Sequence, residues 1–425
     1  MLSGIFGKKT GNPLADIRSA QQLLDDLPKN DTHKLLMDMT ELIESATGNT
    51  DFKLDHQFAL LCLFDEAAQP HARKLIAEYF APRELNSFQE SRLWLVLGNL
   101  SRQTAIAYCT LFDRYAGAEK GSNTIKPQAP LLMSRAVHAL VWQLKYICVH
   151  YDLVEFAIWE NLAHIFSYAE QQQCLDAPVR LYPGSSGNTS VRCEAGHLLG
   201  WYGSGVSSLS PVHMHLTERI LAQYCTDIDV RAQQNQSSLF SFDLSDPDAP
   251  VRVKMNSTVS PSMRYVGMQA MQPKLELLMK TLEKDIVPDD LILGGNYGAE
   301  LVKEAVRHLL AYFMGPPVRG SVRRAIKINF NVENNFANVV GRVRAGLNFS
   351  KERPVWVIED ISANSFLTVL PAQGGDGMRI GGALAPKALV GSEPPRLCHA
   401  TGCVWPWPSW PPCRPIMPCR KSVDC

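Results

Sequence analysis

The 425-residue chain lacks an excess of charge of either sign, a long uncharged apolar run and a secretory start. Lysine plus arginine and aspartate plus glutamate number 42 each. A protein that coats nucleic acid is normally basic, because phosphate neutralisation supplies most of that affinity. The balance therefore argues against nucleic acid as the main partner. No window approaches 18 uncharged apolar residues, and Lys145 interrupts the most apolar segment, so we expect no membrane span. The apolar stretch at the start is too short for a signal peptide.

Catalytic and metal-binding patterns are also missing. No paired-carboxylate, Ser-His-Asp or Cys-His constellation can be placed, so we expect no enzyme and no cofactor. His213 and His215 have no identifiable further ligands, and the cysteines after Cys398 lack the tight pairs of zinc sites, so no metal site is predicted. GIFGKKTG has the wrong residue order for a phosphate loop. The glycines from Gly294 are more simply a loop that leads into a helix than an anion site.

Eleven cysteines, an odd number, bear on the compartment. Six lie singly between Cys62 and Cys225, mostly among apolar residues, as buried free thiols do. This pattern favours a reducing, cytoplasmic compartment.

Helical periodicity dominates residues 1–313. Segments such as HKLLMDMTELIESA carry apolar residues three and four apart. The long run at residues 131–170 is predicted to form two packed helices with a corner near Tyr151 and Asp152. Residues 180–210 are rich in glycine and serine and indicate loops. Residues 251–258 alternate as a strand would, and a last helix is expected before Pro316. We predict an all-helical region, a bundle or irregular array, over 1–313.

The residue pattern changes from helical to strand-like after residues 314–318. Short β-branched and aromatic-rich runs with turn signals between them predict a small β-sheet or barrel at 315–383. The fold class is thus α+β multidomain. Residues 384–425 are different again: they hold nine of the 27 prolines, five of the 11 cysteines and three of the eight tryptophans. Proline cannot donate to a strand ladder, and we predict that this tail is a frameshift product beginning near Ala383.

A polar corner interrupts the apolar runs near the carboxyl end. In VWVIEDISANSFLTVLP the corner contains Asp360, Ser362 and Asn364, and a simple Asx turn would explain it. A basic stretch lies further upstream, with Arg319, Arg323 and Arg324 where the chain enters the first predicted strand, RRAIKINFNV. Arginine forks suit phosphate oxygens and the O6/N7 edge of guanine, while a carboxylate and a hydroxyl accept from the opposite guanine edge. The alternative for the basic stretch is a solvated charged face.

These residues resemble the PilZ family, small six-stranded β-barrels that are bacterial receptors for cyclic di-GMP. The family carries R-x-x-x-R before its first strand and [D/N]-x-S-x-x-G some 20 to 40 residues later. Arg319 to Arg323 matches the first motif, and Asp360 to Ser365 the second. The resemblance implies that Arg319 and Arg323 hold the phosphates and guanines, and that Asp360 and Ser362 contact guanine. With Arg324 and Asn364, these form the predicted ligand-binding set.

Two departures from the family leave alternatives open. Ser365 stands where the family has glycine, which adopts a positive φ without cost; Asn364 tolerates such a corner one residue earlier. The resemblance covers only residues 315–383, so the closing strands are predicted to be missing and the barrel truncated. We predict a cytoplasmic, non-catalytic cyclic di-GMP effector whose helical region contacts an unknown protein partner. The alternative is a helical scaffold with a degenerate PilZ-like domain that mediates protein contacts without binding nucleotide. A third hypothesis, with less support, is nucleic-acid binding through the basic stretch.

Overall fold

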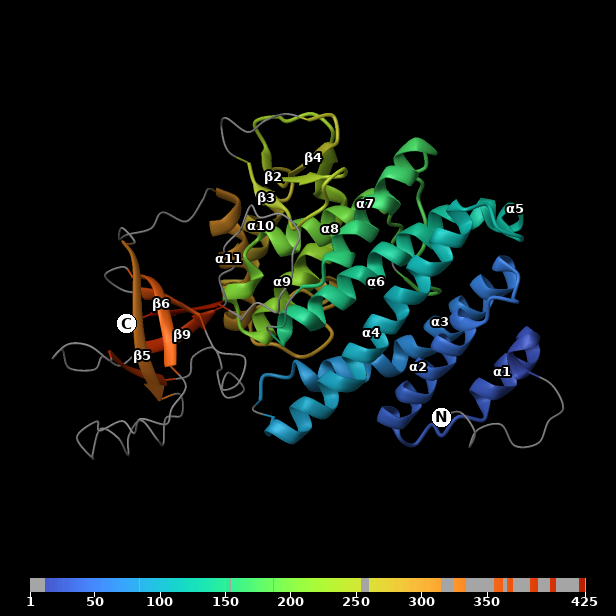
Figure 1. Ribbon diagram of the computed structural model, residues 1–425, viewed down its shortest axis with the longest axis horizontal. Coiled ribbons are helices and arrows are strands. Elements are labelled where there is room, and N and C mark those ends of the chain that lie inside the picture. Colours follow the sequence, from blue (N-terminus) through green and yellow to red (C-terminus); the bar gives the residue numbers. More distant parts are fainter. Residues whose placement is uncertain are drawn as a thin grey trace. The chain divides into compact units, whose positions relative to one another are not determined.

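The computed structural model describes residues 12–314, apart from 84, 151, 153, 186 and 254–259, and a set of strands in the rest of the chain (Figure 1). The chain divides into two compact units, with the main division between Met314 and Gly315; residues 151–153 and 205–211 group with the second unit. Within the described residues, no helix combines the length and apolar character needed to cross a membrane.

Helices build the first part of unit one, as the apolar spacing predicts. They are α1 (Ile17–Asp25), α2 (Thr32–Gly48), α3 (Leu54–Tyr79), α4 (Ser87–Ala116), α5 (Ser122–Ile125), α6 (Ala129–Val149) and α7 (Phe156–Gln171). The predicted break in the long apolar run is confirmed, because α6 ends at Val149 and α7 begins at Phe156. The two helices contact each other, and α6 also packs against α4. Helix α6 is therefore buried along much of its length, including Arg135 and Lys145.

A small antiparallel sheet follows the helices, so the prediction of an all-helical region over 1–313 is wrong. The sheet has the order β1-β4-β2-β3. Its strands are β1 (Asp229–Arg231), β2 (Ser238–Asp243), β3 (Val251–Arg252) and β4 (Met263–Gly267). Only the segment that contains β3 was predicted as a strand. The other strands are too short for their alternation to stand out, and they are stable because Phe240, Phe242 and Tyr265 are buried.

Helix α8 (Val191–Gly203) lies directly on this sheet because three glycines face it. A Cβ added to Gly196 would lie 2.9 Å from Ile228 Cγ2, and one added to Gly203 would lie 3.0 Å from the Phe240 ring. At Gly200 an added Cβ would collide with the Met268 side chain. A side chain at Gly196 would therefore force a shift of the packing, one at Gly203 would require the Phe240 ring to move slightly, and one at Gly200 would displace the flexible end of Met268. Ser190 caps the helix by accepting the Cys193 N–H at 3.2 Å.

Three further helices complete unit one: α9 (Pro211–Gln223), α10 (Gln272–Leu282) and α11 (Ala299–Met314). The predicted last helix is confirmed as α11, which ends before the two prolines. Helices α10 and α11 pack against each other, and the loop between them includes a single turn of 3-10 helix, Asp289–Leu291. This loop and α9 recur in the sites described below.

The second unit contains paired strands. They are β5 (Arg324–Glu333), β6 (Val355–Ile361), β7 (Ser365–Val369), β8 (Ala383–Ala388), β9 (Cys398–Gly402) and β10 (Arg420–Asp424). Antiparallel pairs join β5 to β6, β6 to β7, β5 to β8, β8 to β9, and β10 to both β7 and β9. The strands predicted before the corner and after it correspond to β5, β6 and β7. The frameshift prediction for 384–425 concerns the reading frame of the gene, which strand pairing does not test.

Candidate functional site

Strand register in the second unit pairs the residues that directly follow the arginine motif with the start of the aspartate motif. Strand β5 begins at Arg324, directly after the arginine motif, and β6 ends at Ile361, in the middle of the aspartate motif. The antiparallel register pairs Arg324 with Ile361 and Ala325 with Asp360. The start of one motif strand therefore lies beside the end of the other, as a shared ligand site requires.

The remaining predicted ligand residues flank these strand ends in the sequence. Arg319, Arg323, Ser362 and Asn364 lie outside the described residues. Ser365 is the first residue of β7, and the β6–β7 register pairs Ile361 with Phe366 immediately after it. The backbone thus places Arg324 and Asp360 at one end of the strand pair, and the roles of all six residues stay predictions.

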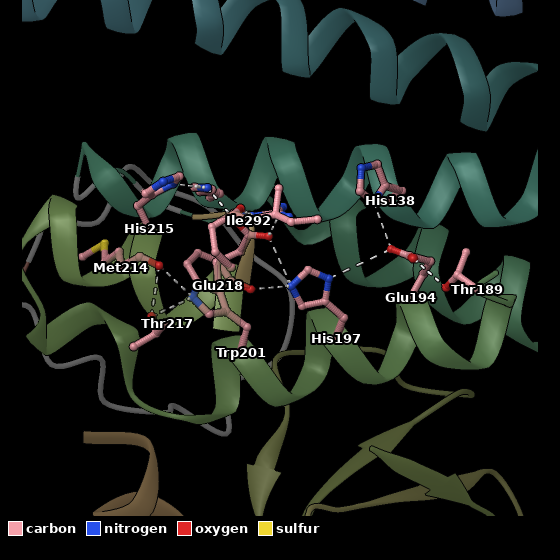
Figure 2. A network of polar contacts seen from close by, with 12 residues as sticks. His138, Thr189, Glu194, His197, Trp201, Met214, His215, Thr217, Glu218 and Ile292 are labelled. Carbon is pink, nitrogen blue, oxygen red and sulfur yellow. Dashed lines mark hydrogen bonds and ion pairs between the residues drawn. The ribbon is translucent and has the colours of Figure 1, made fainter. Parts of the chain in front are cut away.

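A second constellation, which the sequence did not predict, is buried inside unit one (Figure 2). Helix α8 supplies Glu194 and His197, α9 supplies His215 and Glu218, and α6 supplies Lys145. Each of these five side chains belongs to a residue that is at most 5% exposed. Because an unpaired buried charge is very costly, the pairing within this group determines whether the surrounding helices are stable. We call these five residues the buried charge network.

Glu218 is the centre of the buried charge network. Lys145 Nζ donates to its Oε2 at 2.5 Å, and His197 Nε2 lies 3.3 Å from its Oε1. The partly exposed Arg219 also approaches Oε1, at 3.5 Å. Burial alone would raise the pKa of Glu218, but Lys145, Arg219 and His197 outweigh burial and hold the pKa well below its usual range. Glu218 is therefore a carboxylate balanced by cations on three sides.

His197 bridges the two carboxylates of the network. Its Nε2 faces Glu218, and its Nδ1 lies 4.0 Å from Glu194 Oε2. Burial acts to lower the pKa of His197, but the two carboxylates outweigh burial and raise the pKa to about 9. At neutral pH the side chain is thus an imidazolium ion enclosed in the protein.

Glu194 has partners on its other side as well. Thr189 Oγ1 donates to Oε1 at 2.7 Å, and His138 Nδ1 lies 3.0 Å from Oε2. Burial opposes ionisation of Glu194, but His138 and His197 outweigh it and lower its pKa. Through Glu194 the network reaches from α8 to a second position on α6.

His215 is different because it is neutral. Its Nε2 is 2.7 Å from the Leu293 carbonyl oxygen, and its Nδ1 is 2.8 Å from Lys145 Nζ. A carbonyl and an ammonium as the two partners require Nε2–H to donate and Nδ1 to accept. Burial, together with the Lys145 charge, holds the pKa of His215 well below its usual value. The ring also stacks on Phe80, with centroids 4.2 Å apart.

A second ion pair, in which the arginine is buried and the glutamate is partly exposed, joins α6 to α3. Arg135 is 2% exposed, and its Nη2 donates to Glu66 Oε1 at 2.5 Å. Its Nε donates to the Leu181 carbonyl at 2.7 Å, and the guanidinium lies 4.8 Å from the centre of the Tyr182 ring. Every face of this arginine is thus occupied by protein, which indicates a structural role.

Three signals in the sequence could have revealed the buried charge network. Glu194 and His197 are three apart on one predicted helix, and His215 and Glu218 are three apart on another, so each pair shares a helix face. Lys145 interrupts a strongly apolar helix, where a cation needs a buried partner. The pairing between helices involves residues from 21 to 73 positions apart, and no local pattern specifies such a contact.

The other sequence candidates have clear positions. His213 and His215 both lie on α9, but His213 Nε2 contacts Glu304 Oε2 at 2.8 Å while His215 belongs to the buried charge network. Within the residues that the structure describes, no group of three or more His, Cys, Asp or Glu is arranged to hold a metal ion. Gly294 has φ +78° in the loop before α11. The GIFGKKTG segment lies outside the described residues.

The fold defines a mostly helical protein with a small antiparallel sheet and a separate stranded unit. A family model described as cyclic-di-GMP receptor FimW, N-terminal domain, matches residues 18–234. The match covers just over half of the chain, and the chain therefore belongs to this family of cyclic di-GMP receptors. The matched residues run from α1 to β1 and contain the whole buried charge network, while strands β5 to β10 lie outside them. No curated protein and no solved structure gives a significant match.

Proposed function

We propose that this protein is a non-catalytic cyclic di-GMP effector that binds its ligand in the second unit. Membership of the receptor family supports the ligand class. The observation that carries the location is the register of β5 and β6, which sets Arg324 beside Ile361 and Ala325 beside Asp360. A phosphorylated guanine ligand needs cationic forks and a carboxylate at one place, and this register supports that arrangement.

In this proposal the second unit is a PilZ-like β-barrel, and the roles follow the family resemblance. Arg319 and Arg323 hold phosphates and guanines, and Asp360 and Ser362 accept from the guanine edge. Arg324 and Asn364 complete the site. The free thiols of the described cysteines are compatible with work in a reducing cytoplasm.

The helical unit supplies the surface for an unidentified protein partner. Ligand binding draws the segment with Arg319 and Arg323 over the nucleotide, and this segment follows α11 directly in the chain. Closure of the segment would therefore bias a two-state arrangement of the chain, which is the element that an effector needs.

The proposal predicts a saturable calorimetric titration of cyclic di-GMP into the folded chain. Arg323→Ala should weaken binding about 10- to 100-fold, because a charge-assisted hydrogen bond contributes about 1.5–3 kcal/mol. GTP should give no comparable heat. Arg353→Ala removes the same charge from a position just before β6 in the sequence, outside both motifs, and this matched control should bind as the unaltered chain does.

Two results would contradict the proposed site. Equal weakening by Arg323→Ala and Arg353→Ala, with a steep salt dependence and binding to any oligonucleotide, would indicate a general basic surface. Absence of heat from a sample with intact helical circular dichroism would favour the scaffold described next.

Ser365 supports a second candidate, a helical scaffold whose stranded domain mediates protein contacts without nucleotide. It stands at the start of β7, where the resemblance calls for glycine. On this reading Ser365→Gly should restore cyclic di-GMP binding to a chain that shows none, because glycine adopts a positive φ without cost. The titration is repeated on this variant and on Ser365→Ala, which lacks the hydroxyl but not the Cβ. Binding by neither variant would show that Ser365 does not explain the loss.

A further inference from the structure

A cavity of about 430 Å³ lies in the loop between α10 and α11, at one end of the buried charge network. Apolar walls come from Val287, Pro288 and Leu293, and polar groups from Asp289, Asn296 and Tyr297. Its volume is in the range of small-molecule sites. Nothing in the proposed cyclic di-GMP site involves these residues.

Tyr297 carries the strongest sign of an absent ligand. The residue is 7% exposed, and its buried hydroxyl has no hydrogen-bond partner. A Cβ added to Gly295 would lie 3.1 Å from this oxygen, so the hydroxyl packs against Gly295, and both residues belong to the cavity lining. Burial raises the pKa of Tyr297 to about 12, so the phenol stays neutral and keeps both a donor and an acceptor. A buried hydroxyl without a partner is costly, because no hydrogen bond replaces those it made to water.

The charge around the cavity selects the ligand. Its nine lining residues, all of them described, include the carboxylate of Asp289 and no lysine or arginine. The neighbouring chain adds the exposed Glu283, Asp285 and Asp290 against a single exposed cation, Lys284. Among the lining residues an anion would meet the Asp289 carboxylate and no cationic side chain, whereas a cation would be attracted.

Two hydrogen bonds from α9 hold the loop between α10 and α11 against the buried charge network. His215 Nε2 donates to the Leu293 carbonyl at 2.7 Å, and Arg219 Nε donates to the Ile292 carbonyl at 3.2 Å. Ile292 is held at φ +46°, a conformation that β-branched residues rarely adopt. The cavity wall is therefore built on a buried support, and Figure 2 shows Ile292 beside this network.

We propose that this cavity binds an alkylammonium group. The apolar walls contact the alkyl stem, the Asp289 carboxylate accepts from the ammonium, and the Tyr297 hydroxyl accepts a second hydrogen bond from it. A free aliphatic amine and a lysine side chain share this chemistry.

Saturation-transfer NMR on the full chain tests the proposal with four probes of similar size. Pentylamine and 1,5-diaminopentane should bind saturably, whereas pentanoate and 1-pentanol should not. The peptide Gly-Lys-Gly distinguishes the sources: tighter binding than pentylamine indicates a lysine side chain, and weaker binding indicates a free amine.

Three variants locate the binding. Asp289→Asn should weaken pentylamine binding at least about tenfold, and Tyr297→Phe about three- to tenfold. Asp290→Asn removes the same charge from the next residue, outside the cavity lining, and should weaken binding much less than Asp289→Asn does, because an exposed charge without direct contact is screened by solvent. Tyr297→Phe should unfold no more easily than the unaltered chain, because its hydroxyl has no partner to lose. No saturable amine binding, or binding that neither Asp289→Asn nor Tyr297→Phe weakens, would overturn the proposal.

Discussion

Glu218→Ala should lower the free energy of unfolding by about 3–5 kcal/mol, because it leaves a buried cation without its counter-charge. Lys145 Nζ, 2.5 Å from Glu218, and His197 would both remain enclosed after the substitution. Urea denaturation followed by circular dichroism at 222 nm measures the loss, since the helices of unit one dominate that signal. Few single substitutions have so large an effect.

Glu304→Ala is the matched control for this experiment. Glu304 also pairs with a histidine, His213, at 2.8 Å, but its side chain is 49% exposed. An exposed pair of this kind contributes about 0–1 kcal/mol. If Glu218→Ala cost no more than Glu304→Ala, the buried charge network would not stabilise the helices as we argue.

The stability of unit one should fall as the pH rises from about 6.5 to 9, because His197 loses a proton that its carboxylate partners stabilise. The folded pKa of about 9 is above the ordinary value of 6.5. A raised folded pKa contributes stability that is fully present below pH 6.5 and disappears as the pH passes 9. The difference corresponds to about 3 kcal/mol. Urea denaturation at a series of pH values checks this loss.

Neighbouring groups set the limits of this pH window. Glu194 and Glu218 have lowered pKa values, so the stability they contribute is present above their ordinary pKa and is lost only in acid. His215, with its lowered pKa, is neutral in both states above pH 6.5. Burial lowers the pKa of Lys145 in spite of the nearby Glu218 carboxylate. Because a lowered folded pKa of a cation makes the protein more stable as the pH rises, the effect of Lys145 on stability is opposite in sign to that of His197.

A variant isolates the histidine from these neighbours. His197→Gln should make the free energy of unfolding less dependent on pH between pH 6.5 and 9, even if the substitution also lowers stability at every pH. His164→Gln, which changes a histidine with a 54% exposed side chain, should keep the slope. Identical slopes for His197→Gln and the unaltered chain would assign the pH dependence to other groups.

The helices could be read from the sequence because their apolar spacing is local. Helix α11 illustrates this: its periodicity, the glycines before it and the prolines after it gave both ends. The four-stranded sheet is different, because β1 has three residues and β3 has two. Strands this short contain too few residues to show a recognisable alternation of apolar and polar side chains. Their stability comes from partners elsewhere in the chain, which a window of residues does not contain.

The candidate sites differ in the same way. Asp360 belongs to a short motif with fixed spacing and Arg324 directly follows another, so the sequence could predict their chemistry, and the backbone register places Arg324 and Ala325 opposite Ile361 and Asp360. Lys145 and Glu218 belong to no motif, and their pairing depends on how α6 packs against α9. The unpartnered hydroxyl of Tyr297 was not predictable at all, since it is defined by the absence of contacts in the folded chain.

Helix α8 has a consequence for finding relatives of this protein. Its glycine face touches the sheet, and its Glu194 and His197 belong to the buried charge network, so neither face tolerates change without cost. The exposed positions of α4, by contrast, can vary freely. A search with E-x-G-H-x-x-G-W-x-G, followed by H-x-x-E some ten residues later, therefore asks for residues that the packing of this helix requires. Such a signature should identify distant members even where the stranded unit is absent.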